Sequence, residues 1–392
     1  MSEWSPADFV SPIRAIRALK HAGAVDLGIG EPLDCWPDGF ADGVARVAAA
    51  AIPKGGLPYL PHMGHPGLRA HLAKMYGTEH VLVTNGAQGA LAGALIGVVQ
   101  AGDRVVVPDP GFVAYPHLIR WAGGVPVPVD GRASARGLDL DALEQALKAG
   151  AKGLVLGQPS NPTGLALNTA DLQRCMELLA AYGAWLICDV VYAELPMAWD
   201  AIPVPLLSPV SEDNPRRRAA DRASVQAPVG LNVALISSTA KAWCAPGLRI
   251  GWVASNFAGW TERATRVHSL FNTHASSIPQ ELALYLLANL STSQIAATLR
   301  RRGQIAVETL KDVLPGVALA PGSFYVWFRL PGGNDDAAFV KACAVKADGV
   351  ALIPGSAFGV HGQGHVRLAH GVPADQVAEG ARRLACELSA LA

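Results

Sequence analysis

The chain has 392 residues, of which 51% are hydrophobic, and its 32 basic residues balance its 32 acidic ones. This length allows two domains with a large core, and the charge balance argues against a nucleic-acid or polyanion partner. The first residues lack the basic and then apolar pattern of a signal peptide, and the longest apolar run, Ala90 to Val99, is too short to span a membrane.

The N-terminal region begins with apolar side chains at helical spacing over residues 1–25, which predicts an arm or helix packed on another part of the fold. Gly28 and Gly30 follow, and they suit a chain that passes close to a ligand, although an ordinary Gly-Pro turn explains them better by local sequence alone. Tyr59 lies five residues before Gly64, and a tyrosine packed on the rim of a turn is one interpretation. Three nearby histidines do not follow a zinc pattern and are expected at the surface or in a polar network: His62, His65 and His71.

An anion site is predicted where the strand at residues 81–84 meets the helix that starts at Ala90. The turn between them is Asn85-Gly86-Ala87-Gln88-Gly89. Free backbone N–H groups and the helix dipole point at such a turn. The turn has neither the Gly-Lys-Ser/Thr of an ATP P-loop nor a dinucleotide fingerprint. Taken alone the signal is weak, because many α/β turns look alike.

Strands and helices then alternate, which predicts a mainly parallel sheet. Expected strands lie at 103–108, 125–129, 153–156 and 185–189, the last continued by residues 190–192. Expected helices start near Phe112 and cover 140–147 and 169–182. Polar side chains follow two of the strands: Asn161 in Asn-Pro-x-Gly, and Asp189 in Asp-x-x-Tyr192. Considered singly, Phe112 has a common alternative explanation as a core aromatic at a helix start, and Asp189 is better explained as a cap or turn residue.

A lysine follows the next buried strand, at residues 233–236. Ser238 and Lys241 stand where that strand ends, and Arg249 comes eight residues after the lysine, behind a Pro-Gly turn. Ligands of α/β folds bind at such strand ends, and a lysine there can form a Schiff base. The serine and the arginine could converge on one phosphate. An ordinary surface lysine is the alternative. The polar, proline-rich stretch before this strand is expected to be an inserted surface loop at about residues 203–229.

The C-terminal part predicts a second, α+β domain. A strand at 250–253 is followed by helices at 262–275 and 280–290. The pattern then changes to strands at 317–319, 324–329, 350–359 and 365–369, with helices at 335–345 and 374–391. Arg367 lies in Val-Arg-Leu on one of these strands, where an arginine facing solvent is the alternative to a binding role.

Together these motifs resemble the class I/II aminotransferases, the fold-type I pyridoxal-phosphate enzymes of the aspartate aminotransferase superfamily. The resemblance extends from roughly Pro12 to Leu391. It rests on Asn161-Pro-x-Gly, then Asp189-x-x-Tyr192, then Ser238-Thr-Ala-Lys241 with Pro-Gly-x-Arg249-x-Gly-Trp, in that order. The chain departs from the family pattern at Ala240, where the family has a second serine.

The resemblance implies a role for each candidate residue around pyridoxal 5'-phosphate. Lys241 would carry the cofactor as a Schiff base and move the proton, and Asp189 would keep the ring nitrogen protonated, with Tyr192 and Asn161 tuning the ring oxygen. The phosphate would lie among Gly86, Ala87, Gln88, Ser238, Arg249 and, across a dimer interface, Tyr59. Phe112 would stack on the ring, for which a phenyl face suffices. The substrate carboxylate would meet Gly30, Asn161 and Arg367, whose planar fork suits it.

The expected fold is α/β, of fold type I: a large domain with a mainly parallel seven-stranded sheet between helices, and a smaller α+β domain. The expected division is an N-terminal arm with part of the small domain at 1–35, the large cofactor-binding domain at 36–275 and the small C-terminal domain at 276–392. The expected partners are an amino acid and a 2-oxo acid, with a second copy of the chain as homodimer partner, and no metal, nucleic acid or membrane. Six scattered cysteines without a Cys-x-x-Cys pair predict a reducing, cytoplasmic location.

The expected reaction is ping-pong transfer of an amino group between an L-α-amino acid and a 2-oxo acid. A lyase, cyclase or oxidase on the same fold is the alternative, because the lysine motif serves all these reactions. A cofactor-binding regulator without catalysis is a third possibility, against which the intact lysine argues.

Overall fold

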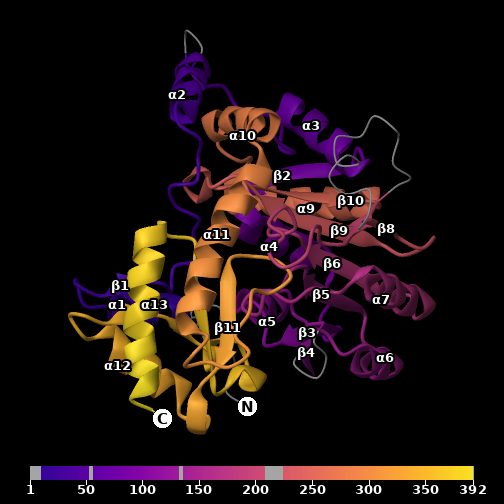
Figure 1. Cartoon of the computed structure of the whole chain (residues 1–392). Helices are drawn as coiled ribbons and strands as arrows, with labels where there is room; N and C mark the ends of the chain where they lie inside the picture. The colour runs from indigo at the N-terminus through magenta and orange to yellow at the C-terminus, as the bar shows by residue number, and fades with distance from the viewer. Residues whose placement is uncertain (1–9, 53–55, 132–135, 208–223, 392) are drawn as a thin grey trace.

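A seven-stranded sheet forms the centre of the larger part of the molecule in the computed structural model, which describes residues 10–52, 56–131, 136–207 and 224–391 (Figure 1). Its strand order is β2-β10-β9-β6-β5-β3-β4. The strands are β2 (Val81–Asn85), β3 (Arg104–Asp109), β4 (Val125–Asp130), β5 (Gly153–Gly157), β6 (Trp185–Asp189), β9 (Val233–Ser238) and β10 (Ile250–Ser255). β10 runs antiparallel to β9 and β2, and the other neighbouring strands are parallel. The predicted mainly parallel, seven-stranded α/β fold is therefore confirmed.

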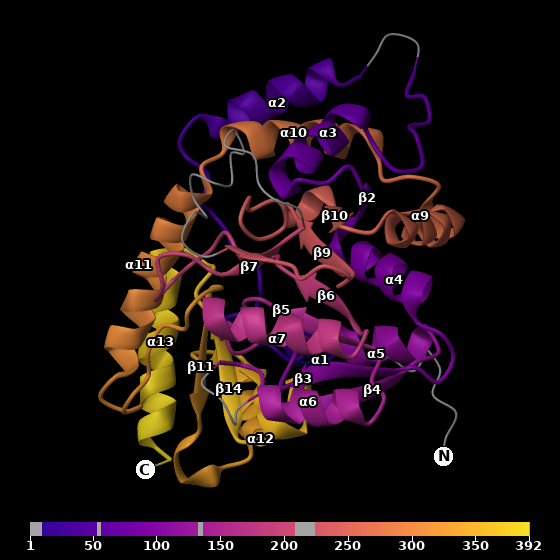
Figure 2. The ribbon, with the colours of Figure 1, turned by 90° about the vertical axis from the view of Figure 1, so that its right-hand side faces the viewer.

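Helices cover both faces of this sheet, which explains why its central strands are buried along their whole length. Every residue of β5, β6, β9 and β10 is buried. One face packs against α4 (Gly86–Val98), α5 (Ala114–Trp121) and α9 (Ala258–Asn272). The other face packs against α3 (Pro66–Tyr76), α6 (Leu140–Lys148) and α7 (Thr169–Ala181), and Figure 2 shows α6 and α7 in front of the sheet, away from α4 and α9. Beyond α3, α2 (Phe40–Ala50) packs against α10 (Ser277–Asn289).

A second hydrophobic core lies in the smaller part of the molecule. Its antiparallel sheet has the order β11-β14-β13, formed by β11 (Tyr325–Arg329), β14 (His365–Ala369) and β13 (Ile353–Pro354). The helices around it are α11 (Thr292–Leu310), α12 (Asp336–Ala344) and α13 (Ala374–Ser389). The N-terminal segment belongs to this part, because β1 (Val25–Asp26) pairs in parallel with β12 (Val350–Ala351) and α1 (Pro12–Ala18) contacts α12. The domain boundaries near residues 36 and 276 remain a proposal.

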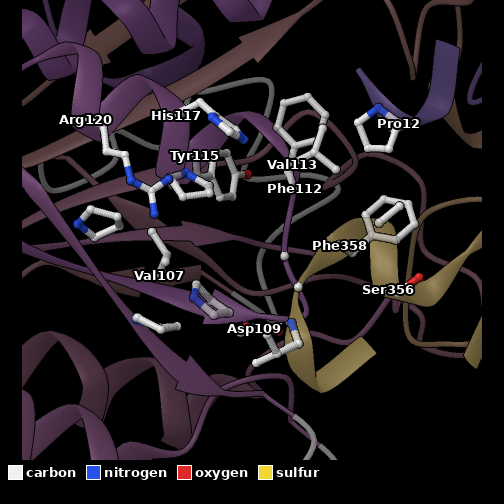
Figure 3. A pocket seen from close by; sticks show the side chains of 18 of the residues that line it. Pro12, Val107, Asp109, Phe112, Val113, Tyr115, His117, Arg120, Ser356 and Phe358 are labelled. Carbon is white, nitrogen blue, oxygen red and sulfur yellow. Dashed lines mark hydrogen bonds between the residues drawn. The ribbon is translucent and has the colours of Figure 1, made fainter. Parts of the chain in front are cut away.

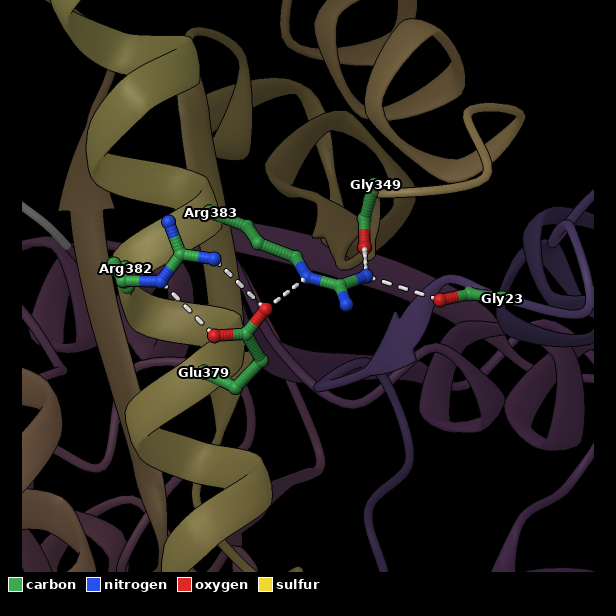
Figure 4. Close-up of polar contacts among 5 residues, drawn as sticks. All are labelled: Gly23, Gly349, Glu379, Arg382 and Arg383. Atoms are coloured by element: carbon green, nitrogen blue, oxygen red, sulfur yellow. Dashed lines mark hydrogen bonds and ion pairs between the residues drawn. The ribbon is translucent and has the colours of Figure 1, made fainter.

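Arg383 of α13 fastens the N-terminal segment to the smaller part (Figure 4). Its Nη1 donates to the carbonyl oxygens of Gly23 at 3.0 Å and Gly349 at 3.1 Å, just before β1 and β12. Glu379, one turn earlier on α13, accepts from Arg383 Nε at 2.7 Å and from Arg382. These hydrogen bonds to Arg382 and Arg383 hold the pKa of Glu379 at about 2. The N-terminal segment is thus held in place before it reaches the larger part.

Several predicted elements differ from the structure. Residues 190–192 turn away from the sheet instead of continuing β6, because Asp189 Oδ1 accepts from the amide of Val191 at 3.3 Å. Residues 317–319 form no strand, and the long helix α11, which follows α10 almost at once, was not predicted. The helix at the N-terminus covers only α1, and most of the expected arm before it lies outside the described residues.

The predicted loop at 203–229 is only partly described. Its two flanks form a short parallel pair, β7 (Val204–Leu206) and β8 (Ser224–Gln226), and residues 208–223 lie outside the described ranges. Within those ranges, no single helix has both the length and the apolar composition of a membrane span; α10 and α11 meet that criterion only as a pair bent by 82°.

Candidate active site

A cavity of about 570 Å³ opens where the carboxyl ends of the central strands meet the N-terminal segment and the smaller part. Asn85, Asp189 and Ser238 are the last residues of β2, β6 and β9, so the sheet brings the ends of these strands to one edge. Most of the predicted site residues line the cavity: Gly30, Ala87, Gln88, Phe112, Asn161, Asp189, Tyr192, Ser238, Lys241, Arg249 and Arg367.

The start of α4 forms an anion cradle on one wall. Asn85 does not cap the helix; its Nδ2 donates to Oδ1 of Asn272 at 2.8 Å instead. Helix-start amides left without a cap can bind an anion, which the helix dipole also favours. Arg249 lies against Gly86 so closely that a Cβ there would stand 2.6 Å from Nη2 of the arginine. The cradle therefore combines backbone donors with a guanidinium, and Ser238 adds a hydroxyl.

Lys241 lies in the segment that connects β9 to β10, three residues after β9 ends. Its Nζ donates to the carbonyl oxygen of Gly30, in the segment that enters from β1. The same atom stands 5.8 Å from the ring centre of Tyr192 and 5.9 Å from that of Phe324. The amine is thus aimed into the cavity between an aromatic wall and a backbone carbonyl, where an electrophile could reach it.

Asp189 is a nearly buried carboxylate at the end of β6. It is 6% exposed, and burial raises its pKa to about 6, against the opposing hydrogen bonds from Tyr115 and the Val191 amide. The Tyr115 hydroxyl donates to Oδ2 at 2.9 Å. A carboxylate buried in this way is stabilised by a cation beside it.

Arg367 is 1% exposed and holds two groups from distant parts of the chain. Nη1 donates to Oδ1 of Asn161 at 2.8 Å, and Nη2 donates to the carbonyl oxygen of Gly28 at 2.7 Å. Its guanidinium lies 4.3 Å from the ring centre of Tyr325. Nε is buried and has no hydrogen-bond partner among the described residues. A buried arginine with a free donor is suited to an anionic ligand.

Two predicted site residues do not line the cavity. Gly86 lies directly behind it, against Arg249. Tyr59 is 86% exposed, and its ring packs edge-on against His274 with 5.6 Å between centres. Tyr59 therefore does not line the cavity of its own chain. Its role in a partner's cavity stays a prediction.

Sequence reasoning gave no role around the proposed cofactor to three aromatic residues that shape the site. Tyr115 bonds Asp189, and Tyr325 bonds the hydroxyl of Tyr192 at 2.7 Å. Phe324 faces Lys241. Tyr115 carried a usable signal in the sequence, because it stands one helical turn after Phe112. Tyr325 and Phe324 lie over 130 residues from Tyr192, and nothing local predicts that contact.

A second cavity, of about 620 Å³, lies beside the first (Figure 3). Phe112, Val113 and Tyr115 line both cavities and form the wall between them. On its far side stand Asp109 of β3 and the Ser356–Val360 segment of the smaller part. The carboxylate of Asp109 accepts from the amides of Val360 at 3.2 Å and His361 at 3.1 Å, which joins the two parts of the molecule here.

No group of three or more His, Cys, Asp or Glu side chains in the described ranges is arranged to hold a metal ion.

Comparisons with known proteins agree on one family. The model of the family described as aminotransferase class I and II matches residues 22–384. LL-diaminopimelate aminotransferase of Desulforudis audaxviator is 28% identical, over 97% of this chain and 95% of that protein. Aspartate aminotransferase of Pyrococcus horikoshii is 26% identical, over 94% of this chain and 91% of that protein. A solved structure of Thermus thermophilus aspartate aminotransferase with maleate is 25% identical, with a TM-score of 0.80, and covers 99% of this chain and all of that chain (100%).

Proposed function

Because the chain belongs to the aminotransferase class I and II family, we propose that its cavity binds pyridoxal 5'-phosphate and moves an amino group between an L-α-amino acid and a 2-oxo acid. The chain is an aminotransferase by its family and its relatives. The proposal adds the cofactor site and the role of each residue. One observation carries it: an amine, a buried carboxylate, a buried guanidinium and an anion cradle all face one cavity.

The residues present fit the cofactor chemically. The cradle of α4 and Arg249 suits a phosphate, and Ser238 stands on the same cavity. Asp189 is a buried carboxylate whose charge a protonated ring nitrogen would compensate. Phe112 lines the same cavity and could offer it a ring face. Lys241 lines the same cavity, with its amine 5.8 Å from the ring centre of Tyr192 and 5.9 Å from that of Phe324.

When bound, the cofactor supplies an aldehyde that bonds covalently to amines and a ring that takes up the electrons released at the substrate Cα. Lys241 Nζ would hold the cofactor, and its amine would move the proton at the substrate Cα. Asp189 would favour a proton on the ring nitrogen by its negative charge. Tyr192 is the hydroxyl proposed to donate to the ring oxygen, and in the structure it is held by Tyr325.

Arg367 binds the substrate carboxylate in this proposal. Its unpartnered Nε and its contacts with Asn161 and Gly28 present a planar, rigid fork. Asn161 uses its oxygen on the arginine, which leaves its Nδ2 group to donate to the cofactor or the substrate. Gly30 lies beside Lys241 and allows the chain to approach the ligand closely.

A homodimer completes the proposal. The segments at 57–62 and 270–274 lie side by side, since His274 Nε2 accepts from the Leu60 amide at 3.2 Å. They expose apolar side chains: Leu57, Tyr59, Leu270 and Phe271. A surface of this kind is suited to a protein partner. A second copy would cover it and place Tyr59 beside the partner's phosphate. A cytoplasmic location stays a prediction of the cysteine pattern.

The test is an absorbance spectrum of the purified protein with pyridoxal phosphate and a panel of single L-amino acids. A yellow band that bleaches with one amino acid and returns with a 2-oxo acid supports transamination and identifies the substrate. Release of ammonia without this cycle favours a lyase. A protein that never takes up the cofactor contradicts the proposed site.

A further inference from the structure

Tyr325 is the first residue of β11, and it contacts two residues that already have a place in the proposed site. Its hydroxyl oxygen lies 2.7 Å from that of Tyr192. Its ring centre lies 4.3 Å from the guanidinium carbon of Arg367. The side chain lines the cavity and is almost fully buried. One residue of the smaller part therefore meets both the tyrosine assigned to the cofactor and the arginine assigned to the substrate carboxylate.

The pairing of β11 with β14 brings Tyr325 and Arg367 together. In this antiparallel pair Trp327 is directly opposite Arg367. Tyr325, two residues before Trp327, is therefore a diagonal neighbour of Arg367 on the same face of the sheet. The ring of Phe358 lies 5.1 Å from the same guanidinium. Contacts between a cation and an aromatic ring are strongest where water is excluded, as it is around the buried Arg367.

The protons available decide the direction of the hydrogen bond between the two tyrosines. Each hydroxyl donates one proton and can also accept. In the proposed function the Tyr192 proton goes to the ring oxygen of the cofactor, so in its bond with Tyr325 the Tyr192 oxygen can only accept. Among the described residues, Tyr192 is the one hydrogen-bond partner of the Tyr325 hydroxyl. A buried hydroxyl needs an acceptor for its proton, and for Tyr325 that acceptor is the Tyr192 oxygen.

The surroundings keep the two hydroxyls protonated and in place. Burial raises the pKa of Tyr192 well above its usual value, and the contact with Tyr325 raises it further. The segment that enters from β1 closes on the Tyr325 hydroxyl, because a Cβ at Gly30 would stand 2.7 Å from that oxygen. Glycine at position 30 therefore leaves the room that the Tyr325 hydroxyl occupies.

We propose that Tyr325 is a positioning residue for both halves of the site. Its hydroxyl donates to Tyr192 and so aims the Tyr192 proton at the ring oxygen of the cofactor. Its ring holds the guanidinium of Arg367 in place for the substrate carboxylate. This inference rests on the proposed function and deepens it. Because the hydroxyl acts on the cofactor and the ring acts on the substrate, their removal has different consequences.

The hydroxyl acts through the strength of the hydrogen bond that Tyr192 donates. A hydroxyl that accepts a hydrogen bond becomes a stronger donor, by roughly 10–30% per bond. The colour of the loaded protein changes with pH as the nitrogen that joins Lys241 to the cofactor takes up a proton. A hydrogen bond to the ring oxygen stabilises its negative charge most when that proton is absent, and so lowers the pH of the colour change. Removal of the Tyr325 hydroxyl should therefore raise this pH.

Two substitutions separate the hydroxyl from the ring. Tyr325→Phe removes the hydroxyl and keeps a ring beside Arg367. Tyr325→Leu removes both. Loss of the contact between ring and guanidinium predicts an increase of about 3- to 30-fold in KM for the amino acid substrate, in Tyr325→Leu alone.

Tyr76→Phe is the matched control. Tyr76 is buried, and its hydroxyl accepts from Nε1 of Trp252 at 3.0 Å. It does not line the cavity. A general structural effect of losing a buried hydroxyl would appear in this variant too. We expect its colour change and its KM to match those of the wild type.

The main measurement is the absorbance of the loaded wild type and variants, recorded in steps of pH without substrate. Tyr325→Phe and Tyr325→Leu should raise the midpoint of the colour change by about 0.3 pH unit, and Tyr76→Phe should leave it unchanged. A lower midpoint in Tyr325→Phe would show that Tyr325 accepts the Tyr192 proton, and it would overturn the inference. An unchanged midpoint would overturn it as well. Steady-state kinetics test the ring, whose role is refuted by equal KM values in the two Tyr325 variants.

A double-mutant cycle tests the pair of hydroxyls without the cofactor. Urea unfolding of cofactor-free wild type, Tyr192→Phe, Tyr325→Phe and the double variant gives their coupling. We expect a coupling of about fivefold in the unfolding equilibrium constant, the size of one neutral hydrogen bond. Strictly additive losses would contradict the contact itself.

The wild-type protein separates this inference from the proposed function. If the wild type never takes up the cofactor, the proposed function is contradicted, and the roles assigned to Tyr325 fall with it. If the wild type binds the cofactor and transaminates while the variants show none of the expected changes, only the inference about Tyr325 is overturned.

Discussion

The hydroxyl of Tyr115 donates a 2.9 Å hydrogen bond to Oδ2 of Asp189, at the buried end of β6. This bond and the Val191 amide lower the pKa of Asp189, yet burial outweighs them and the pKa stays at about 6. The cofactor-free protein therefore keeps a carboxylate at neutral pH whose burial is only partly compensated by Tyr115, the Val191 amide and the charge of Lys241. The proposed ring nitrogen would supply the missing positive charge, which ties the cofactor to the stability of the fold.

Asp189→Asn should stabilise the cofactor-free protein at neutral pH. The folded-state pKa of about 6 lies above the ordinary 3.8, so the folded protein binds this proton more tightly. Its favourable contribution is present below pH 3.8 and is lost as the pH rises through 6. A difference of two pKa units corresponds to roughly 3 kcal/mol, from which the lost hydrogen bond subtracts about 1.

The measurement is urea unfolding of cofactor-free wild type and variant at pH 4.5, 6 and 8. The variant's advantage in unfolding free energy should grow with pH, and transaminase activity of the loaded variant should fall. An advantage that does not change with pH would mean that Asp189 is not the titrating group.

Lys241→Ala should abolish turnover, because the same amine both holds the cofactor and transfers the proton. Proton transfer and covalent catalysis together predict a loss of at least about a thousandfold in kcat. Steady-state kinetics of the loaded variant check this, with Lys341→Ala on the exposed side of α12 as the control. Full activity in Lys241→Ala would refute the mechanism.

The sequence predicted those parts of the site that follow directly on apolar runs. Asp189 and Lys241 stand at or just after the end of a buried strand, and the α4 cradle follows the third such end. These positions follow from local pattern and from the rule that parallel strands share one carboxyl edge. For the same reason the seven-stranded sheet was predictable.

Contacts between distant segments were not predictable from local patterns. Arg367 meets Asn161 across 206 positions, and Tyr192 meets Tyr325 across 133. The resemblance to the family brought Arg367 and Asn161 to the site together, but gave no signal for the tyrosine pair. The turn at Val190–Tyr192 was mistaken for strand because two valines favour strands, while a side-chain bond from Asp189 Oδ1 to the Val191 amide decided the outcome.

Arg367→Lys should raise KM for the amino acid substrate and change kcat little. Lysine keeps the charge but loses the planar fork, and it cannot hold Asn161 and the substrate together. Loss of one charge-assisted bond predicts an increase of about 10- to 100-fold in KM. Arg329→Lys, at the exposed end of β11, is the matched control. An unchanged KM would remove the role assigned to Arg367.

Gly86→Ala should weaken binding of pyridoxal phosphate, because the new Cβ would stand 2.6 Å from Nη2 of Arg249 and push the guanidinium away from the cradle. Gly86 also has a φ of 73°, where any side chain is strained, so backbone strain must be separated from the contact. Gly150→Ala is the matched control, since Gly150 has a φ of 90° and nothing stands within 4 Å of its Cβ position.

Fluorescence titration with the cofactor gives Kd for both variants, and urea unfolding gives their stabilities. Both should lose about 1 kcal/mol of stability from the strained backbone. Only Gly86→Ala should show a Kd raised by about tenfold or more, as expected for the loss of one charge-assisted phosphate contact. Equal affinities in the two variants would show that Arg249 does not bind the phosphate from its place beside Gly86. The anion cradle would then consist of the α4 amides and Ser238 alone.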